Sequence, residues 1–325
     1  MSELTTRETA LARSRMYDLL SRIYLHGMDA GLLPIVADIP ELAAVLPATF
    51  DADEAAAEHQ AIFGFNVFPY QSIFLDPAGL LGGDEPARVQ ASYAGSGFAP
   101  ANSDASPDHI GYELAFVAFL CGAEADAWED DLPQTAARMQ QRQADFMTAH
   151  LLRWIAPFLA ALARQDSPFY AALAALTQTI LVDHAAAVLS AAPVELSFTL
   201  PPAPDLAAND EAGLRDIADN LLAPPVSGLY LSRADIDRLG RRFDLPRGFG
   251  ERRQLLVNLL RAAGTYEQFP ALCTEIAALA AGDDHRYAEM GRDYPSFHPW
   301  SQLWNDRVQL TVAQLETLAQ QAAAT

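Results

Sequence analysis

Asp108 and His109 stand side by side in the stretch SPDHIGYELAFVAFL, which covers residues 106 to 120. A carboxylate next to an imidazole could form part of a catalytic dyad, a metal half-site, a helix cap or a peptide-binding seam. A dyad requires the acid to face the imidazole, and adjacent residues on a helical turn seldom face each other. Acid–base catalysis by this pair alone is therefore not expected.

The residues around the pair have the types that begin a helix. Ser106 can act as an N-cap, Pro107 suits the first helical position, and Asp108 favours the positive N-terminal end of the helix. A protonated imidazole is disfavoured at that end. The helix cap thus explains three of these residues and leaves His109 unexplained.

Other signatures of enzyme chemistry are absent from the sequence. None of the seven histidines lies in an HExxH or similar ligand spacing, so no metal site is predicted. Cys121 and Cys273 form no CxxC pair and give no disulfide framework, and there is no GxSxG motif. The glycine-rich GLLGGDE at 79–85 lacks the lysine of a phosphate-binding loop, and the chain contains no lysine at all. No cofactor is predicted, although a weak nucleotide site built from backbone N–H groups, or an enzyme that pairs His109 with a distant acid, stays open as an alternative.

The charge distribution favours a basic partner. The chain has 42 acidic residues against 21 basic ones, a net charge of −21, and every basic residue is arginine. Such a field repels nucleic acid and anionic membranes. Residues 1–165 hold 22 acids and 9 arginines, whereas residues 233–261 hold 8 arginines and 4 acids. We expect this Arg-rich segment to dock on the acidic part of its own chain; the alternative is contact with a partner, as in a helical scaffold or regulator.

The elements that must position these residues are helices. Alanine and leucine are abundant, β-branched runs are short, and apolar residues recur at helical spacing nearly throughout, which predicts an all-α fold. The first helix should begin at Thr5, where Thr5-Thr6-Arg7-Glu8 has the spacing of a capping box, and a long helix should cover about 135–164, with a kink at Pro157. Residues 66–107 are rich in glycine, proline and aromatics, which indicates a structured loop with short helical pieces.

A break in composition divides the chain. Four prolines lie in residues 193–210, which predicts a linker. We therefore expect a helical core over 1–192 with a hinge near 99–109, the linker, and a C-terminal helical module over 211–325. No apolar run approaches the roughly 18 residues that cross a bilayer, and the start lacks the apolar stretch of a secretory signal. A cytoplasmic setting without a membrane span is expected.

Taken together, five stretches resemble the TorD/DmsD family of cytoplasmic chaperones for molybdenum enzymes, over about residues 5–190. PYQSIFLD at 69–76 is similar to the PYxS element of that family, and HQAIFGF at 59–65 to the helix end before it. VQASYAGSGF at 89–98 matches the Tyr and Gly-Phe that follow. SPDH at 106–109 is similar to the hinge motif EPDH, with serine in place of glutamate, and FMTAHLLRWIAPF at 146–158 to the long helix with its His-Leu-x-x-Trp pattern.

This resemblance implies a helical chaperone without catalysis of its own. Its partner would be the catalytic subunit of a molybdopterin-containing oxidoreductase, bound through the twin-arginine signal peptide and held until cofactor is inserted. The residues beside the hinge motif are those associated with signal-peptide binding in the family. Carried over, they are Asp108 and His109, with Tyr70, Ser72 and Phe74 as further candidates. The resemblance leaves a homo-oligomer open.

The chemistry of such a signal agrees with the charge of the chain. Two guanidinium groups beside an apolar helical segment require carboxylates next to an apolar groove. Glu113 is a further candidate carboxylate, and Phe98 is a candidate for the apolar wall. Ordinary core packing is the alternative for each aromatic residue.

Overall fold

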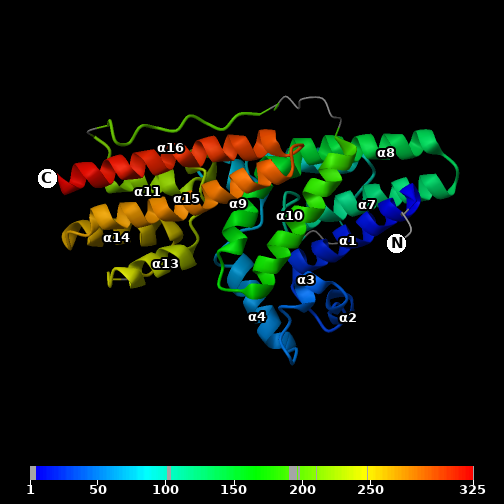
Figure 1. Ribbon diagram of the computed structural model, residues 1–325, viewed down its shortest axis with the longest axis horizontal. Coiled ribbons are helices and arrows are strands. Elements are labelled where there is room, and N and C mark those ends of the chain that lie inside the picture. Colours follow the sequence, from blue (N-terminus) through cyan, green and yellow to red (C-terminus); the bar gives the residue numbers. More distant parts are fainter. Residues whose placement is uncertain are drawn as a thin grey trace.

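The computed structural model describes residues 5–100, 104–189, 196, 198–209, 211–246 and 248–324. Within these residues the chain is helical and has no strand, which confirms the predicted all-α bundle (Figure 1). The helices, in chain order, are α1 Thr6–His26, α2 Leu33–Ala37, α3 Pro40–Ala43, α4 Ala52–Phe63, α5 Gln71–Leu75, α6 Glu85–Gly95, α7 Ile110–Glu129, α8 Pro133–Phe146, the π-helix η1 Met147–Leu151, α9 Leu152–Ala163, α10 Pro168–Val188, α11 Leu214–Leu222, α12 Pro224–Ser227, α13 Arg233–Arg242, α14 Arg252–Thr265, α15 Phe269–Asp293 and α16 His298–Ala323.

The N-terminal helix α1 pairs with α7. The predicted capping box is present, because Thr5 accepts from the amide of Glu8 while the Glu8 carboxylate accepts from the amide of Thr5. Farther along α1, the Ser14 hydroxyl donates to the carbonyl of Ala118 at 2.9 Å. At the other end of the pair a Cβ on Gly111 would lie 2.4 Å from Cγ of Leu25, so only glycine permits this approach.

The predicted long helix is interrupted by a π-turn. It runs from residue 133 to 163, as α8, η1 and α9, with the π-turn at Met147–Leu151 and Pro157 inside α9. Proline has no N–H, so the carbonyl of Arg153 loses its partner within the helix. The indole Nε1 of Trp304, on α16, donates to that carbonyl at 2.9 Å. The C-terminal helix thus satisfies the group that Pro157 leaves open.

The C-terminal helices share one hydrophobic core with the N-terminal ones. Figure 1 shows α15 and α16 as a long pair that reaches over α9. Tyr230 stacks on Phe74, with ring centroids 5.0 Å apart, and its hydroxyl donates to the carbonyl of Asn66 at 2.9 Å. In the predicted linker, residues 193–195, 197 and 210 lie outside the described residues, while residues 198–209 follow α16, where Gln314 donates to the carbonyl of Pro204. The division into core, linker and module stays a prediction.

A largely buried arginine from the core joins the two regions. Arg164, next to the end of α9, donates to Asp283 on α15 at 2.5 Å and to the carbonyl of Tyr230 at 2.5 Å. Its guanidinium also lies 3.6 Å from the carboxylate of Asp235 on α13. The core therefore contributes the cation at this contact, and the C-terminal helices contribute the anions.

The Arg-rich segment 233–261 does contact residues 1–165, because the amide of Ala234 donates to Asn66 and Arg238 donates to the carbonyl of Arg164. In the described part of the chain, however, no arginine of the segment forms an ion pair with an acid of residues 1–165. The described ion pairs of its arginines stay within the C-terminal helices: Arg238–Asp235, Arg241–Asp237, Arg242–Glu275 and Arg253–Asp219. Most of these pairs are exposed and lie on α13 and α14 or beside them. A count of charges along the sequence cannot reveal such local pairing, because it does not show which way each helix faces.

Two helical stretches have the length and apolar composition of a membrane span, although no such run was expected from the sequence. They are Pro133–Ala163 and Pro168–Val188. In the first, 78% of the apolar window is buried within the protein, so core packing accounts for its composition. In the second stretch, 39% of the apolar window is buried, and the exposed positions of this helix include Ala175, Thr179 and Asp183.

Candidate peptide-binding groove

The two short motifs singled out in the sequence lie against each other. Tyr70 and His109 form an isolated antiparallel β-bridge. The amide of Gln71 donates to the carbonyl of Asp108, and the amide of Ile110 donates to the carbonyl of Pro69, both at 2.9 Å. The segment 69–72 at the start of α5 is thereby fixed to the segment 106–110 at the start of α7.

Asp108 is completely buried within this junction. Its carboxylate accepts from the amide of Ser72 at 2.9 Å and from the hydroxyl of Ser106 at 2.5 Å. It therefore caps the first turn of α5 from a distant part of the chain. In this conformation the carboxylate does not face solvent, and both of its oxygens already accept hydrogen bonds from the protein.

His109, and not Ser106, is the N-cap of α7. The imidazole is buried, and its Nδ1 accepts from the amide of Gly111 at 3.0 Å. Burial lowers the pKa of His109 to about 3, so the ring is neutral at physiological pH. A neutral imidazole that accepts a hydrogen bond is compatible with a helix N-terminus, which resolves the difficulty raised by the sequence. With Nδ1 occupied and its basicity low, His109 lacks the properties of a general base.

The other predicted residues also support the junction. Glu113 is buried, where it accepts from the indole of Trp154 at 3.3 Å; burial, and then the charge of Asp108, raises its pKa well above the ordinary value. Ser72 and Phe74 are buried on α5, and Tyr70 is half-buried with its ring 5.0 Å from that of His109. The proposed contacts of these six residues with a peptide stay a prediction. Together, the hydrogen bonds between segments 69–72 and 106–110 hold α5 against the start of α7, and we call this junction the hinge lock.

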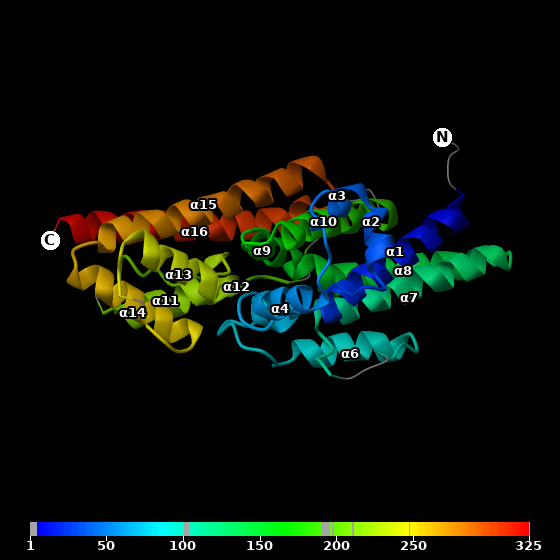
Figure 2. The same ribbon diagram turned by 90° about the horizontal axis from the view of Figure 1, so that it is seen from below.

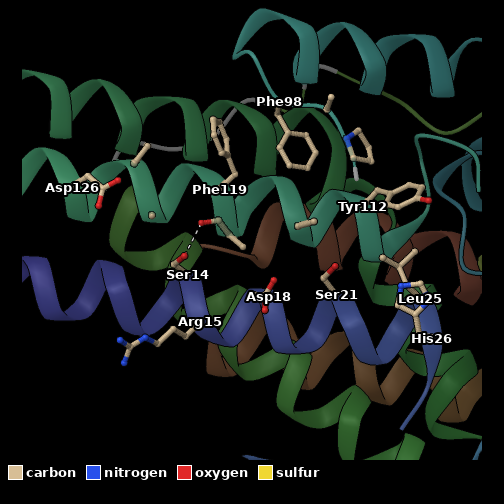
Figure 3. Close-up of a pocket in the computed structure, with 16 residues that line it drawn as sticks. Ser14, Arg15, Asp18, Ser21, Leu25, His26, Phe98, Tyr112, Phe119 and Asp126 are labelled. Carbon is tan, nitrogen blue, oxygen red and sulfur yellow. Dashed lines mark hydrogen bonds between the residues drawn. The ribbon is translucent and has the colours of Figure 1, made fainter. Parts of the chain in front are cut away.

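Beside this lock lies a groove between α1 and α7, with residues 98–100 along its third side (Figure 3). Its volume is about 690 Å³. The lining comprises Ser14, Arg15, Asp18, Ser21, Leu25, His26, Phe98, Ala99, Pro100, Tyr112, Ala115, Ala118, Phe119, Gly122, Ala123 and Asp126. Small side chains of α7 contribute much of this lining, which keeps the space between the two helices open. We call it the α1–α7 groove.

One wall of the α1–α7 groove is aromatic. Phe98, predicted as a wall residue, lines it half-buried, with its ring 5.5 Å from that of Phe119 and 5.3 Å from that of Phe116. Phe119 is 41% exposed, which is unusual for a side chain of its size. Tyr112, at the far end, contacts the ring of His109 at 6.0 Å. The groove is therefore continuous with the hinge.

The rim of the groove has a carboxylate on each helix. Asp18 on α1 and Asp126 on α7 are both exposed. Figure 3 shows Asp18 and Ser21 pointing from α1 toward α7, whereas Arg15 extends away from it. An apolar wall beside accessible carboxylates is the arrangement that a cationic, amphipathic peptide requires.

Sequence reasoning missed Asp18, Phe119 and Asp126. Two signals could have revealed them. The apolar residues of α7 surround the whole helix, and such a helix is either fully enclosed or leaves an apolar face for a partner. On α1, Ser14, Asp18 and Ser21 recur at four- and three-residue steps, which places them on one face.

The fold defines the class: an all-helical bundle in which a β-bridge locks α5 to the start of α7 beside an open groove. Residues 32–160 match the model of the family described as nitrate reductase delta subunit, so this part of the chain is similar to that family. The match confirms the resemblance drawn from the five motifs. It runs from the start of α2 into α9 and includes the lock and the α7 wall of the groove. No curated protein compared with the chain matches it.

Proposed function

We propose that this protein is a maturation chaperone for the catalytic subunit of a molybdopterin-containing oxidoreductase. It binds the twin-arginine leader of that subunit in the cytoplasm and assists cofactor insertion before export. The family match supports the chaperone role. The α1–α7 groove is the observation that carries leader binding, because it places an exposed aromatic wall beside two carboxylates.

The apolar part of the leader is expected to lie in the groove as a helix. Phe119 and Phe98 offer surface that a leucine-rich helix covers, and burying one large apolar side chain contributes about 1.5–3 kcal/mol. Charge-assisted hydrogen bonds to guanidinium add about 1.5–3 kcal/mol each where they are shielded from solvent. A few such contacts give affinity on the order of micromolar, which suits a chaperone that must release its client.

In this scheme the buried hinge residues position the groove and do not touch the leader. The Tyr93 hydroxyl donates to the carbonyl of Pro107 at 2.9 Å, and Asp108 holds Ser106 and Ser72. These bonds hold residues 106–108, which follow Phe98 along the chain, against α6 and α5. The buried residues of the hinge that were predicted to bind the peptide, such as Asp108 and Ser72, thus hold the groove in place, whereas Phe98 lines it.

Calorimetric titration with the leader peptide of the oxidoreductase encoded next to this protein tests the proposal. Phe119→Ala should weaken binding by roughly tenfold, the worth of about 1.4 kcal/mol of lost contact. Tyr266→Ala is the matched control, because Tyr266 is an exposed aromatic residue (58%) just after α14 and does not line the groove. Equal affinity of the wild type and Phe119→Ala would contradict the proposal.

A further inference from the structure

A second cavity lies just beyond the end of α1. It has a volume of about 400 Å³ and opens between the loop after α3, the helix α4 and the start of α10. Figure 1 shows α3 and α4 beside the lower end of α10. Its apolar lining includes Met28, Leu46, Phe50 and Phe169. This cavity is concave, lined with apolar side chains and separate from the hinge lock.

The rim of this cavity is acidic and has no counter-charge. Asp51, Glu54 and Glu58 line it, and no arginine or histidine does. The sequence from residue 23 to residue 87 contains ten acids and no arginine or lysine. Among the described residues, none of the three rim acids takes part in an ion pair. We call this cavity the acidic pocket.

Two of the rim acids repel each other. Glu54 and Glu58 are four residues apart on α4, so they share one face, about 6 Å apart along the axis. Like charges at this spacing destabilise a helix by a few tenths of a kcal/mol. A cation bound between them would remove that repulsion. Asp51 has a different role, because it caps α4 by accepting from the amides of Asp53 and Glu54.

The acidic pocket and the α1–α7 groove are neighbours. Leu25 and His26 line the groove, and Met28 lines the pocket. Only Gly27 separates them along the chain; it ends α1 with a positive φ of 77°, which favours glycine and turns the backbone away from the helix. A peptide whose apolar helix lies in the groove can therefore reach the pocket with its adjoining residues, across the end of α1.

We infer that the acidic pocket receives the arginine pair of the leader while the α1–α7 groove receives its apolar stretch. This inference rests on the proposed function and divides the leader between two sites. The groove is less suited to the arginine pair, because Arg15 and His26 line it together with Asp18 and Asp126. The acidic pocket offers carboxylates without a competing cation, and apolar walls for the methylene stems of arginine.

The test uses the full chain, the Glu54→Gln/Glu58→Gln variant, and two synthetic leader peptides. One peptide has the arginine pair, and the other has glutamines in its place. Against the arginine peptide the variant should lose roughly three- to tenfold in affinity, as for two partly exposed ion pairs. It should also lose most of the salt dependence of binding. The glutamine peptide should bind the variant and the wild type equally.

Asp53→Asn/Glu41→Gln is the matched control, because it removes two acids from α4 and α3 that do not line the acidic pocket. Its affinity should equal that of the wild type. Unchanged discrimination between the two peptides in Glu54→Gln/Glu58→Gln would overturn the inference while leaving the chaperone proposal intact. Failure of the wild type to bind either peptide would instead overturn the proposed function.

Discussion

Replacement of Asp108 by alanine separates a structural role from a direct role in client binding. The carboxylate is completely buried and accepts two hydrogen bonds, from the Ser72 amide and the Ser106 hydroxyl. Hydrogen bonds to a charged group contribute about 1.5–3 kcal/mol each, so Asp108→Ala should lower the free energy of unfolding by about 3–5 kcal/mol. Asp108→Asn should cost less, on the order of 1–2 kcal/mol, because its carbonyl oxygen can still accept from Ser72.

The assay combines denaturant unfolding with peptide titration on the same preparations. The titration is done at a temperature at which both variants stay folded. The binding free energy of the leader should then change by less than the free energy of unfolding. It should change more in Asp108→Ala than in Asp108→Asn, in the same order as the loss of stability. A direct contact predicts the opposite pattern, in which Asp108→Asn loses affinity while its unfolding midpoint stays at the wild-type value. That result would refute the assignment of Asp108 as a positioning residue.

Three further outcomes concern the core. Trp304→Phe should lower the free energy of unfolding by about 1–3 kcal/mol, because the carbonyl of Arg153 is left without a donor; an unchanged denaturation midpoint would contradict this. Arg164→Met should cost about 3–5 kcal/mol by leaving Asp283 buried and unpaired, and combining it with Asp283→Asn should recover part of the loss in the same assay. His184 is held neutral, with a pKa lowered by burial to about 3, against an ordinary value of 6.5. Only the unfolded chain takes up that proton between these values, so stability should fall as pH decreases below 6.5, and less steeply in His184→Gln.

The helices and the position of the hinge could be predicted from the sequence, whereas the burial or exposure of individual side chains could not. Helical spacing, the capping box at Thr5 and the junction around Asp108 and His109 are local patterns, and the structure contains each of them. Burial at the hinge is a tertiary property: nothing in SPDH shows that segment 69–72 pairs with it and covers both side chains. For the same reason Phe98 was recognised from its motif, whereas Phe119 could not be told from its buried neighbours on an apolar helix.

Pro157 and Trp304 together determine whether the carbonyl of Arg153 is bonded to the protein or to solvent. Before α16 docks, the carbonyl of Arg153 has no donor from the protein, so a water molecule must remain beside α9 to solvate it. The indole of Trp304 takes the place of that water as the donor to the carbonyl. A chain that lacked α16 would therefore keep a solvated carbonyl group at Arg153, on the central helix α9.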